Sequence, residues 1–159
     1  VIRDMETGTL AVHAVWEPDP NDPDWTVDRA DVNAAIERLF ETYDVQMLWC
    51  DPSFYEPDVL EWSKHWRRRV ERIPPTNHRI APMAQQFLAD LVAGELGHDG
   101  DTRLQRHVLN AVATEAGSFR KEKKGSPRKV DLLACAVLAN GAYHATKDRM
   151  PRPRRAVIL

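Results

Sequence analysis

The stretch VQMLWCDPSF (residues 45–54) is the part of the sequence that decides the fold. Five of the six residues before Asp51 are hydrophobic, and a short apolar run bounded by turn residues is typical of a buried strand. Asp51 therefore stands at the end of a predicted strand and is followed by Pro52. Because Asp-Pro is common in turns, Asp51 can simply start a loop. The alternative is that the buried strand rigidly supports a reactive or metal-binding carboxylate.

The elements on either side of this strand predict an α/β domain. Two strands around a turn at Gly8 open the chain, and apolar residues at helical spacing follow from Asp28 to Tyr43. Beyond Asp51 the pattern alternates helices with a short edge strand. The predicted segments are a helix over 56–70, an edge strand within 72–79, a helix over about 80–96, a short helix or helix-to-strand transition over 102–113, and an apolar helix over 130–145. This order predicts a mixed sheet with helices on both faces.

Composition narrows the class of protein. With 159 residues, 43% of them hydrophobic and 29% charged, the chain suits one globular domain. Cys50 and Cys135 both lie inside apolar runs, which predicts reduced core residues of an intracellular protein. No apolar segment approaches the ~18 residues of a membrane span, and no signal peptide opens the chain. We therefore expect a cytoplasmic protein without a membrane partner. The net charge of −2 does not exclude nucleic acid as a partner, because local clusters of charge decide such binding.

A second acid, Asp131, stands in the first turn of the apolar helix over 130–145. An unpaired carboxylate beside such a helix is costly, so we expect a cation or strong donors nearby. Asp131 can simply complement the helix dipole, as Asp51 can simply start a turn. Together, the two acids fit a site for Mg²⁺ or Mn²⁺, since hard cations prefer carboxylate oxygens.

A basic segment lies directly before Asp131. Between residues 118 and 131 a single acid, Glu122, precedes Asp131 among the cations Arg120, Lys121, Lys123, Lys124, Arg128 and Lys129. A solvated charged loop is one interpretation. The other is a flexible hairpin or loop that follows a phosphate backbone and brings it beside the metal ions. Among the histidines, the pattern predicts a core role for His107 and a turn role for His98, although His98 could also bind metal.

Three stretches resemble a known family. They are VWEP (15–18), WCDPSFYEPDVLEWSKHW (49–66) and GELGHDGDTRLQRHVLNAVATEAGSFRKEKKGSPRKVDLLACAVLA (94–139). Together they resemble the C-terminal nuclease domain of the large subunit of bacteriophage terminases, in the group common in phages of actinobacteria. The resemblance implies an RNase H-like fold over residues 1–146, followed by a basic C-terminal tail, 147–159. It also implies cutting of concatemeric double-stranded DNA in the cytoplasm of the host cell.

In that family three acids hold two divalent metals, and the resemblance makes Asp51 the second acid and Asp131 the third. It implies two-metal phosphodiester hydrolysis with Mg²⁺ or Mn²⁺, and it gives the basic segment the role of holding DNA. The family's first acid and its strand are expected upstream of Val1, with Asp4 as the nearby substitute. The implied protein partners are the terminase ATPase domain, the small terminase subunit and the portal.

Two alternatives stay open. One is another RNase H-like nuclease, such as a resolvase or transposase core. The other is a DNA-binding or motor-interaction domain that has this fold but no complete metal site. The presence of a third carboxylate discriminates between an enzyme and a binding domain.

Overall fold

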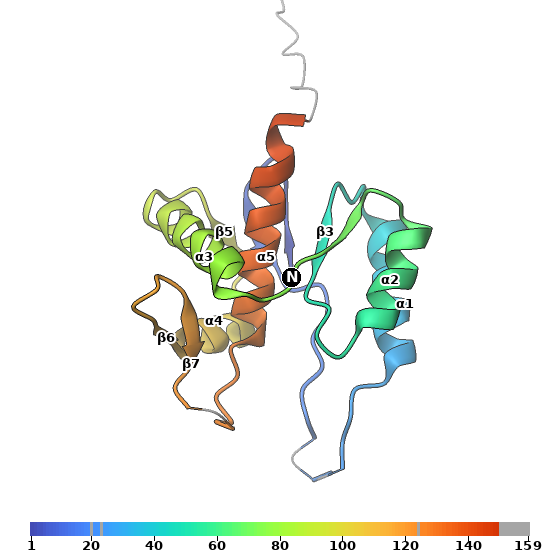
Figure 1. The fold of residues 1–159 in the computed structure, drawn as a ribbon, viewed down its shortest axis with the longest axis horizontal. Helices are drawn as coiled ribbons and strands as arrows, with labels where there is room; N and C mark the ends of the chain where they lie inside the picture. Colours follow the sequence, from blue (N-terminus) through green and yellow to red (C-terminus); the bar gives the residue numbers. More distant parts are fainter. Residues whose placement is uncertain (20, 23, 124, 150–159) are drawn as a thin grey trace, which may run out of the picture.

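The computed structural model describes residues 1–149 except 20, 23 and 124. Its helices and strands gather on both sides of one long helix, α5 (Figure 1). The strands are β1 (Ile2–Arg3), β2 (Thr9–Ala11), β3 (Leu48–Cys50), β4 (Val70–Arg72), β5 (Gly97–His98), β6 (Ala111–Ala113) and β7 (Phe119–Lys121). The helices are α1 (Arg29–Thr42), α2 (Glu56–His65), α3 (Asn77–Val92), α4 (Thr102–Leu109), α5 (Asp131–Thr146) and a 3-10 turn, η1 (Lys147–Arg149).

The strands form three small sheets. A mixed sheet has the order β1-β2-β5, in which β1 is antiparallel and β5 parallel to β2. A second sheet pairs β3 with β4 in parallel, and a third is the antiparallel β6–β7 hairpin. The α/β class and a mixed sheet are therefore confirmed. The expectation of one sheet is wrong for the described residues, because no ladder joins β1 to β3.

The N-terminal hairpin is closed by Gly8 and Asp4. Gly8 has a φ of 72°, and a Cβ there would lie 2.7 Å from the carbonyl oxygen of Glu95, so glycine is required on two grounds. Asp4 Oδ1 accepts hydrogen bonds from the backbone N–H groups of Glu6 and Thr7 and from the Thr7 hydroxyl. These bonds lower the pKa of Asp4, with the Thr7 backbone contributing most. Asp4 therefore holds the turn.

One half of the molecule packs α1 and α2 on the β3–β4 sheet. Val59, Trp62 and Val70 form its buried centre, and the apolar stripe of α1 packs against them. Asp28 caps α1 by accepting the N–H of Ala30. Trp62 of α2 is buried and donates its indole N–H to Asn33 at 2.8 Å. The apolar residues at helical spacing in α1 are thus the residues that pack on this buried centre.

α5 is the centre of the other half. It is apolar almost all round, as a helix covered on several sides must be. Leu132 and Ala136 pack with Leu10 of β2 and Leu104 of α4 in one buried cluster. α5 also contacts α3, β1 and β3, so it is the element that both halves share.

The predicted ends of several elements shift in the structure. α2 stops at His65 and β4 begins at Val70, earlier than the predicted edge strand, while α3 begins at Asn77 and ends at Val92. No described helix combines the length and the hydropathy that a membrane-spanning segment needs. In the predicted basic tail, 147–149 form η1, and 150–159 lie outside the described residues.

Candidate metal site and basic hairpin

Asp51 follows β3 directly and is exposed. Its Oδ1 accepts the backbone N–H of Ser53 at 2.8 Å, and Tyr55 N–H donates to the carbonyl of Pro52 at 3.1 Å. Asp51 therefore begins a turn. This turn role leaves the carboxylate at the surface, where it can also face a ligand, so the two interpretations are compatible.

Asp131 is the first residue of α5, with 68% of its side chain exposed. Lys121 of β7 brings its Nζ to 4.0 Å from Asp131 Oδ1. The sequence predicted such a cation for this acid, and it comes from the basic segment. The position at the start of the helix also lets the carboxylate interact favourably with the helix dipole.

The thiol of Cys135, one turn after Asp131 on α5, is affected by both acids. Burial is the main cause that raises the pKa of the Cys135 thiol, the amino group of Val1 lowers it, and the charges of Asp131 and Asp51 raise it further. Both carboxylates, although far apart in sequence, thus affect the same thiol. Surrounding protein desolvates this thiol, yet the Cys135 residue reaches solvent and is exposed, so the expectation of a core cysteine is wrong for it, while Cys50 is half-buried.

Among the described residues, no third acidic side chain joins Asp51 and Asp131 in a metal-binding group. Within the described residues, no group of three or more His, Cys, Asp or Glu side chains is placed to hold a metal ion. Asp4, the nearby substitute for the first acid, uses its Oδ1 in the hairpin turn after β1. Its role as a metal ligand stays a prediction.

A buried histidine lies beneath the start of α5. His107 of α4 is 3% exposed, and its Nδ1 accepts the backbone N–H of Leu132 at 2.9 Å. Burial lowers its pKa, although the charges of Asp131 and Glu17 oppose this effect. His107 is thus a satisfied core histidine, as predicted, and it supplies one of the acceptors that the start of a helix requires.

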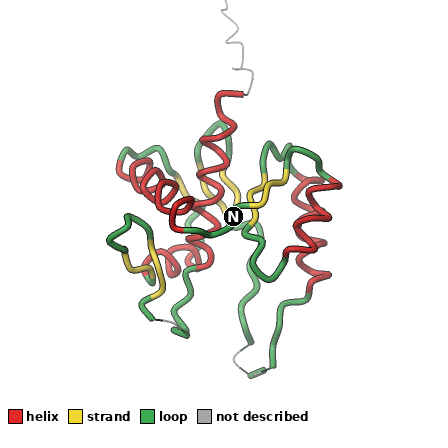
Figure 2. The backbone as a smooth tube through the Cα atoms, in the orientation of Figure 1, coloured by secondary structure: helices red, strands yellow, loops and turns green. Residues whose placement is uncertain are grey.

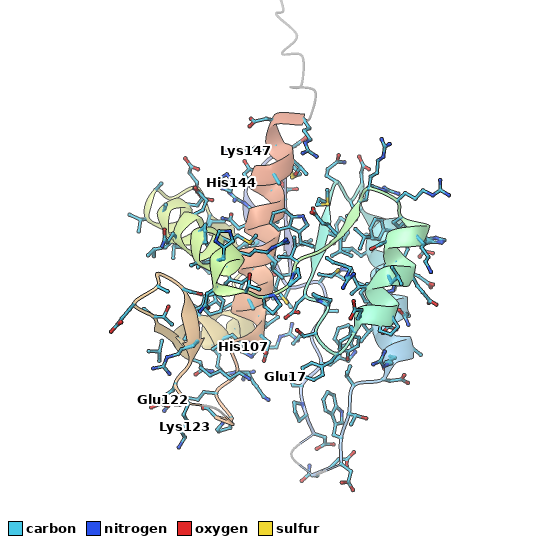
Figure 3. All side chains as sticks on the ribbon, in the orientation of Figure 1. Glu17, His107, Glu122, Lys123, His144 and Lys147 are labelled. Atoms are coloured by element: carbon cyan, nitrogen blue, oxygen red, sulfur yellow. The ribbon has the colours of Figure 1, made fainter. Side chains whose placement is uncertain are left out.

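Glu17 is a charged residue of this region that the sequence reasoning did not single out. It follows the N-terminal strands and pairs with Arg106 of α4. Figure 3 shows Glu17 and His107 at the same end of α5. The only sequence signal was the position of Glu17 in the VWEP stretch, after a strand-like run, which parallels the position of Asp51 after β3.

The basic segment begins on the β6–β7 hairpin and continues as a loop into α5. Arg120 donates to the carbonyls of Lys121 and Glu122, which braces the turn after β7. Arg128 lies 3.6 Å from Glu122. Lys123 and Lys129 are exposed, and Lys124 lies outside the described residues. The predicted hairpin-or-loop is confirmed, and Lys121 ties it to Asp131.

His98 accepts the N–H of Gly100 at 3.1 Å and thus has the predicted turn role. Beside Asp51 an open pocket is lined mainly by prolines, and it includes Phe54, whose side chain is 91% exposed at a φ of 67°. The sequence did not indicate this exposed aromatic residue, since Phe is a residue type that is most often buried.

Comparison with known proteins gives relatives from bacteriophages. The chain is 31% identical over 153 residues to the Gene 13 protein of Mycobacterium phage L5, an alignment that covers 87% of this chain and 26% of the relative. The Gene 13 protein of Mycobacterium phage D29 is also 31% identical over 153 residues, with 25% of that protein covered. The chain thus spans about a quarter of the length of these relatives. No protein-family model and no solved structure matches it.

Proposed function

We propose that this chain is the metal-dependent endonuclease domain of a bacteriophage DNA-packaging protein, with Asp51 and Asp131 as metal ligands. The observation that carries the proposal is that Asp51 directly follows β3 and Asp131 begins α5, two elements that pack on each other. The relatives from mycobacteriophages support a phage origin. The resemblance of the motifs around both acids to terminase nuclease domains supports the activity.

The residues fit a hard divalent cation in part. Mg²⁺ is commonly bound through one or two carboxylates, with water and substrate phosphate as the other ligands, and Asp51 and Asp131 supply this number. Bound ions would supply a nucleophilic water and stabilise the leaving 3′ oxygen. Asp51 and Asp131 would hold them from β3 and α5, which are fixed by packing on each other. Lys121, now beside Asp131, would turn to the DNA phosphate.

In this proposal the basic segment before Asp131 binds the DNA backbone. Arg120, Lys123, Arg128 and Lys129 lie exposed on the segment that leads into Asp131. Cations on such a segment neutralise phosphates and release counterions, which favours binding to DNA of any sequence. In the cell, the substrate would be concatemeric double-stranded DNA in the host cytoplasm. A packaging ATPase domain, a small terminase subunit and the portal would be the partners.

The test is cleavage of supercoiled plasmid with Mg²⁺ or Mn²⁺ by the wild type, Asp51→Asn and Asp131→Asn. We expect each variant to lose at least about 100-fold in rate, because a ligand contributes several kcal/mol to transition-state stabilisation. Asp31→Asn, which changes an exposed acid on α1 away from the site, is the matched control and should cleave like the wild type. Calorimetric titration with Mn²⁺ alone should show weaker binding by both site variants. Unchanged cleavage by both would refute the assignment.

A second function is favoured by one observation. Since no group of three acidic or other metal-binding side chains occurs among the described residues, the chain could bind DNA without cutting it. The same assay decides between the two. Retarded plasmid without nicks, and no Mn²⁺ binding in calorimetry, would identify a DNA-binding or motor-interaction domain.

A further inference from the structure

The turn that follows β3 displays one aromatic side chain to solvent. We propose that Phe54, on this turn, stacks on an unpaired nucleobase of DNA. The inference rests on the proposed function in one respect, namely that DNA reaches Asp51. It adds a contact to a base, whereas the basic segment would contact only the backbone. In Figure 2 the turn is part of the loop that joins β3 to the start of α2.

The backbone of this turn is in a conformation that phenylalanine rarely adopts. Tyr55 N–H donates to Pro52 O at 3.1 Å, so residues 52–55 form a hydrogen-bonded β-turn. Phe54 is the third residue of the turn and has a φ of 67°. A positive φ at this position is typical of type II turns, which usually have glycine there. A bulky residue in this conformation is strained, and such strain is found mainly at functional sites.

The exposure of Phe54 makes its strained conformation harder to explain by packing. At 91%, it is the most exposed large hydrophobic residue in the part of the chain that the structure describes. A single exposed hydrophobic side chain needs no explanation by itself. Here, however, the ring is exposed and its backbone is strained, although glycine would avoid both costs. The ring is therefore better explained by a contact with a ligand than by the fold.

Contacts from the protein side hold the turn in place. Arg29 of α1 donates to the Phe54 carbonyl oxygen at 2.9 Å. The Arg29 guanidinium also lies over the Tyr55 ring, 5.1 Å from its centre, and Tyr55 packs against the buried centre around Val59. The backbone that carries the exposed ring is thus fixed before a ligand arrives. A fixed backbone lowers the entropic cost of binding.

The Phe54 ring borders an open hollow of about 480 Å³ that suits a flat ligand. Besides Phe54, the hollow is lined by two polar residues, Ser53 and Glu56, and by four prolines. The prolines come from the turn, the start of α2 and the segment after β4: Pro52, Pro57, Pro74 and Pro75. The hollow thus combines apolar ring surfaces with a few hydrogen-bonding groups, which is the composition of a site for a small aromatic ligand.

The charges around the hollow favour a base over a phosphate. Arg72 pairs with Glu56, and Arg29 pairs with Asp58, so the arginines that contact this region are neutralised by acids. Asp51 adds a further negative charge to the same turn. These acids disfavour a phosphate, whereas an uncharged base is not repelled. The exocyclic amino group of a base can also donate to a carboxylate such as that of Glu56.

The distance to Asp51 limits which base is contacted. Asp51 Oδ1 accepts the backbone N–H of Ser53 at 2.8 Å, so the acid and the aromatic ring belong to one local structure. Three residues span at most about 11 Å, and one DNA strand advances about 3.4 Å per nucleotide. The contacted base would thus lie a few nucleotides from the phosphate at Asp51. Because the faces of paired bases are covered by their neighbours, the ring would stack on a base that is unpaired.

The first test measures the preference for unpaired bases in EDTA, where no metal-dependent cleavage occurs. Fluorescence anisotropy compares the affinity for a duplex with a short single-stranded overhang and for the same duplex with blunt ends. Stacking of a base on an aromatic ring contributes about 5- to 150-fold in affinity. We expect the wild type to prefer the overhang, and Phe54→Leu, which stays apolar but has no flat ring, to lose this preference by at least about fivefold.

Two further variants are controls for this test. Phe54→Trp should keep the preference, because it keeps a flat ring. Tyr43→Leu removes an exposed aromatic residue at the other end of α1 and should bind like the wild type. Cross-linking gives a direct readout. An overhang that contains 5-iodouracil should cross-link on irradiation to Phe54, as located by mass spectrometry, and should not cross-link at this position in Phe54→Leu.

Phe54→Gly separates binding from folding. Glycine adopts the positive φ without strain, so we expect a midpoint of urea unfolding no lower than that of the wild type. The preference for the overhang should nevertheless be lost, as in Phe54→Leu. A large decrease in the midpoint would show that the ring supports the fold, and this result would overturn the inference.

The outcomes distinguish this inference from the proposed function. An unchanged preference in Phe54→Leu, without a cross-link at Phe54, would overturn the base contact and leave the ring as a contact for a protein partner. Plasmid cleavage that depends on Asp51 would in that case still support the nuclease. A preference that depends on Phe54, in a protein that does not cleave DNA, would support the base contact and refute the nuclease. No binding to either duplex would overturn both.

Discussion

Asp90 is the residue on which most buried polar contacts converge. It is 3% exposed and accepts hydrogen bonds from Arg3 at 3.1 Å, Gln86 at 2.7 Å and His144 at 2.6 Å. Through these bonds Asp90 of α3 is linked to β1 and α5, and Figure 3 marks His144 on α5. Burial raises the pKa of Asp90, but the bonds from His144 and Gln86 outweigh this effect and lower it to about 2.

The low pKa predicts how stability depends on pH. Because the folded pKa is about 2 and the ordinary value is 3.8, the charged Asp90 stabilises the fold above about pH 4. This stabilisation is lost as the pH falls from about 4 to 2. We expect Asp90→Asn to lower the free energy of unfolding by about 3–5 kcal/mol at pH 6, since Arg3 is left as a buried charge without its partner. Urea titrations at pH 6, 4 and 2.5 measure both effects.

The difference between wild type and Asp90→Asn should shrink toward pH 2.5. Asp44→Asn, which changes an exposed loop acid, is the matched control and should follow the wild type at each pH. A constant difference across this range would show that Asp90 acts by packing and not by its charge.

At the scale of single residues, the sequence predicted roles that depend on local chemistry. Asp131 at a helix start and His107 on a core face could both be assigned from neighbours in the chain. The exposure of Cys135 could not be assigned in this way, because its neighbours in the chain are apolar while Cys135 itself is exposed. The roles of Asp90 and Glu17 were also not predictable, since they depend on partners in other elements.

Among the elements, β3 and α5 are held in register by one close contact. Gly141 lies against the Trp49 ring, and a Cβ would also approach Met83 Sδ at 3.3 Å. The Trp49 ring has little freedom to move, because its Nε1 donates to Glu71 at 2.9 Å. Gly141 is therefore a packing requirement, in spite of its unfavourable helix propensity.

We expect Gly141→Ala to destabilise the protein by about 1–2 kcal/mol. Overpacking costs about 1–3 kcal/mol, and the better helix propensity of alanine returns up to about 1 kcal/mol. Denaturant unfolding of a double-mutant cycle with Trp49→Phe measures the effect. In the Phe background the smaller ring should remove most of the cost. A stabilising Gly141→Ala in the Trp49 background would contradict the close packing.

Long elements with a repeated apolar pattern were predicted better than short strands whose pairing partner is distant in the chain. α1 and α5 were predicted because their apolar patterns extend over several turns. β5, which is only two residues, was not, since nothing in its own sequence marks it as a strand and its pairing to β2 is distant in the chain. The short strand β3 was recognised by its composition, whereas β4 lies earlier than the predicted edge strand, and the separation of both from β1 could not be seen locally.

The molecule as a whole has two packed halves that meet at α5. The half with α1, α2, β3 and β4 has its own buried centre, and the half with β1, β2, α4 and α5 has another. Beyond the contact of β3 with α5, His13 gives a further link by bonding to the carbonyl of Ala35 at 3.1 Å. The sequence indicated a single core, because periodicity shows which residues are buried but not against which partner.

This division predicts two cooperative opening units in native-state hydrogen exchange. Amides of β3, β4 and α2 should exchange together with one free energy, and buried amides of α5 and α4 with a higher one, since α5 contacts more elements. Mass-spectrometric exchange with increasing denaturant measures both. A single common free energy for all protected amides would contradict the division.

The position of α5 at the junction also has a mechanical consequence. Because α5 packs on β3 as well as on its own half, a relative rotation of the two separately packed units would turn about this helix. Asp51 is fixed to one unit through β3 and Asp131 to the other through α5, so a rotation of one unit relative to the other would change the separation of the two acids. A ligand that bound both units would restrict this rotation.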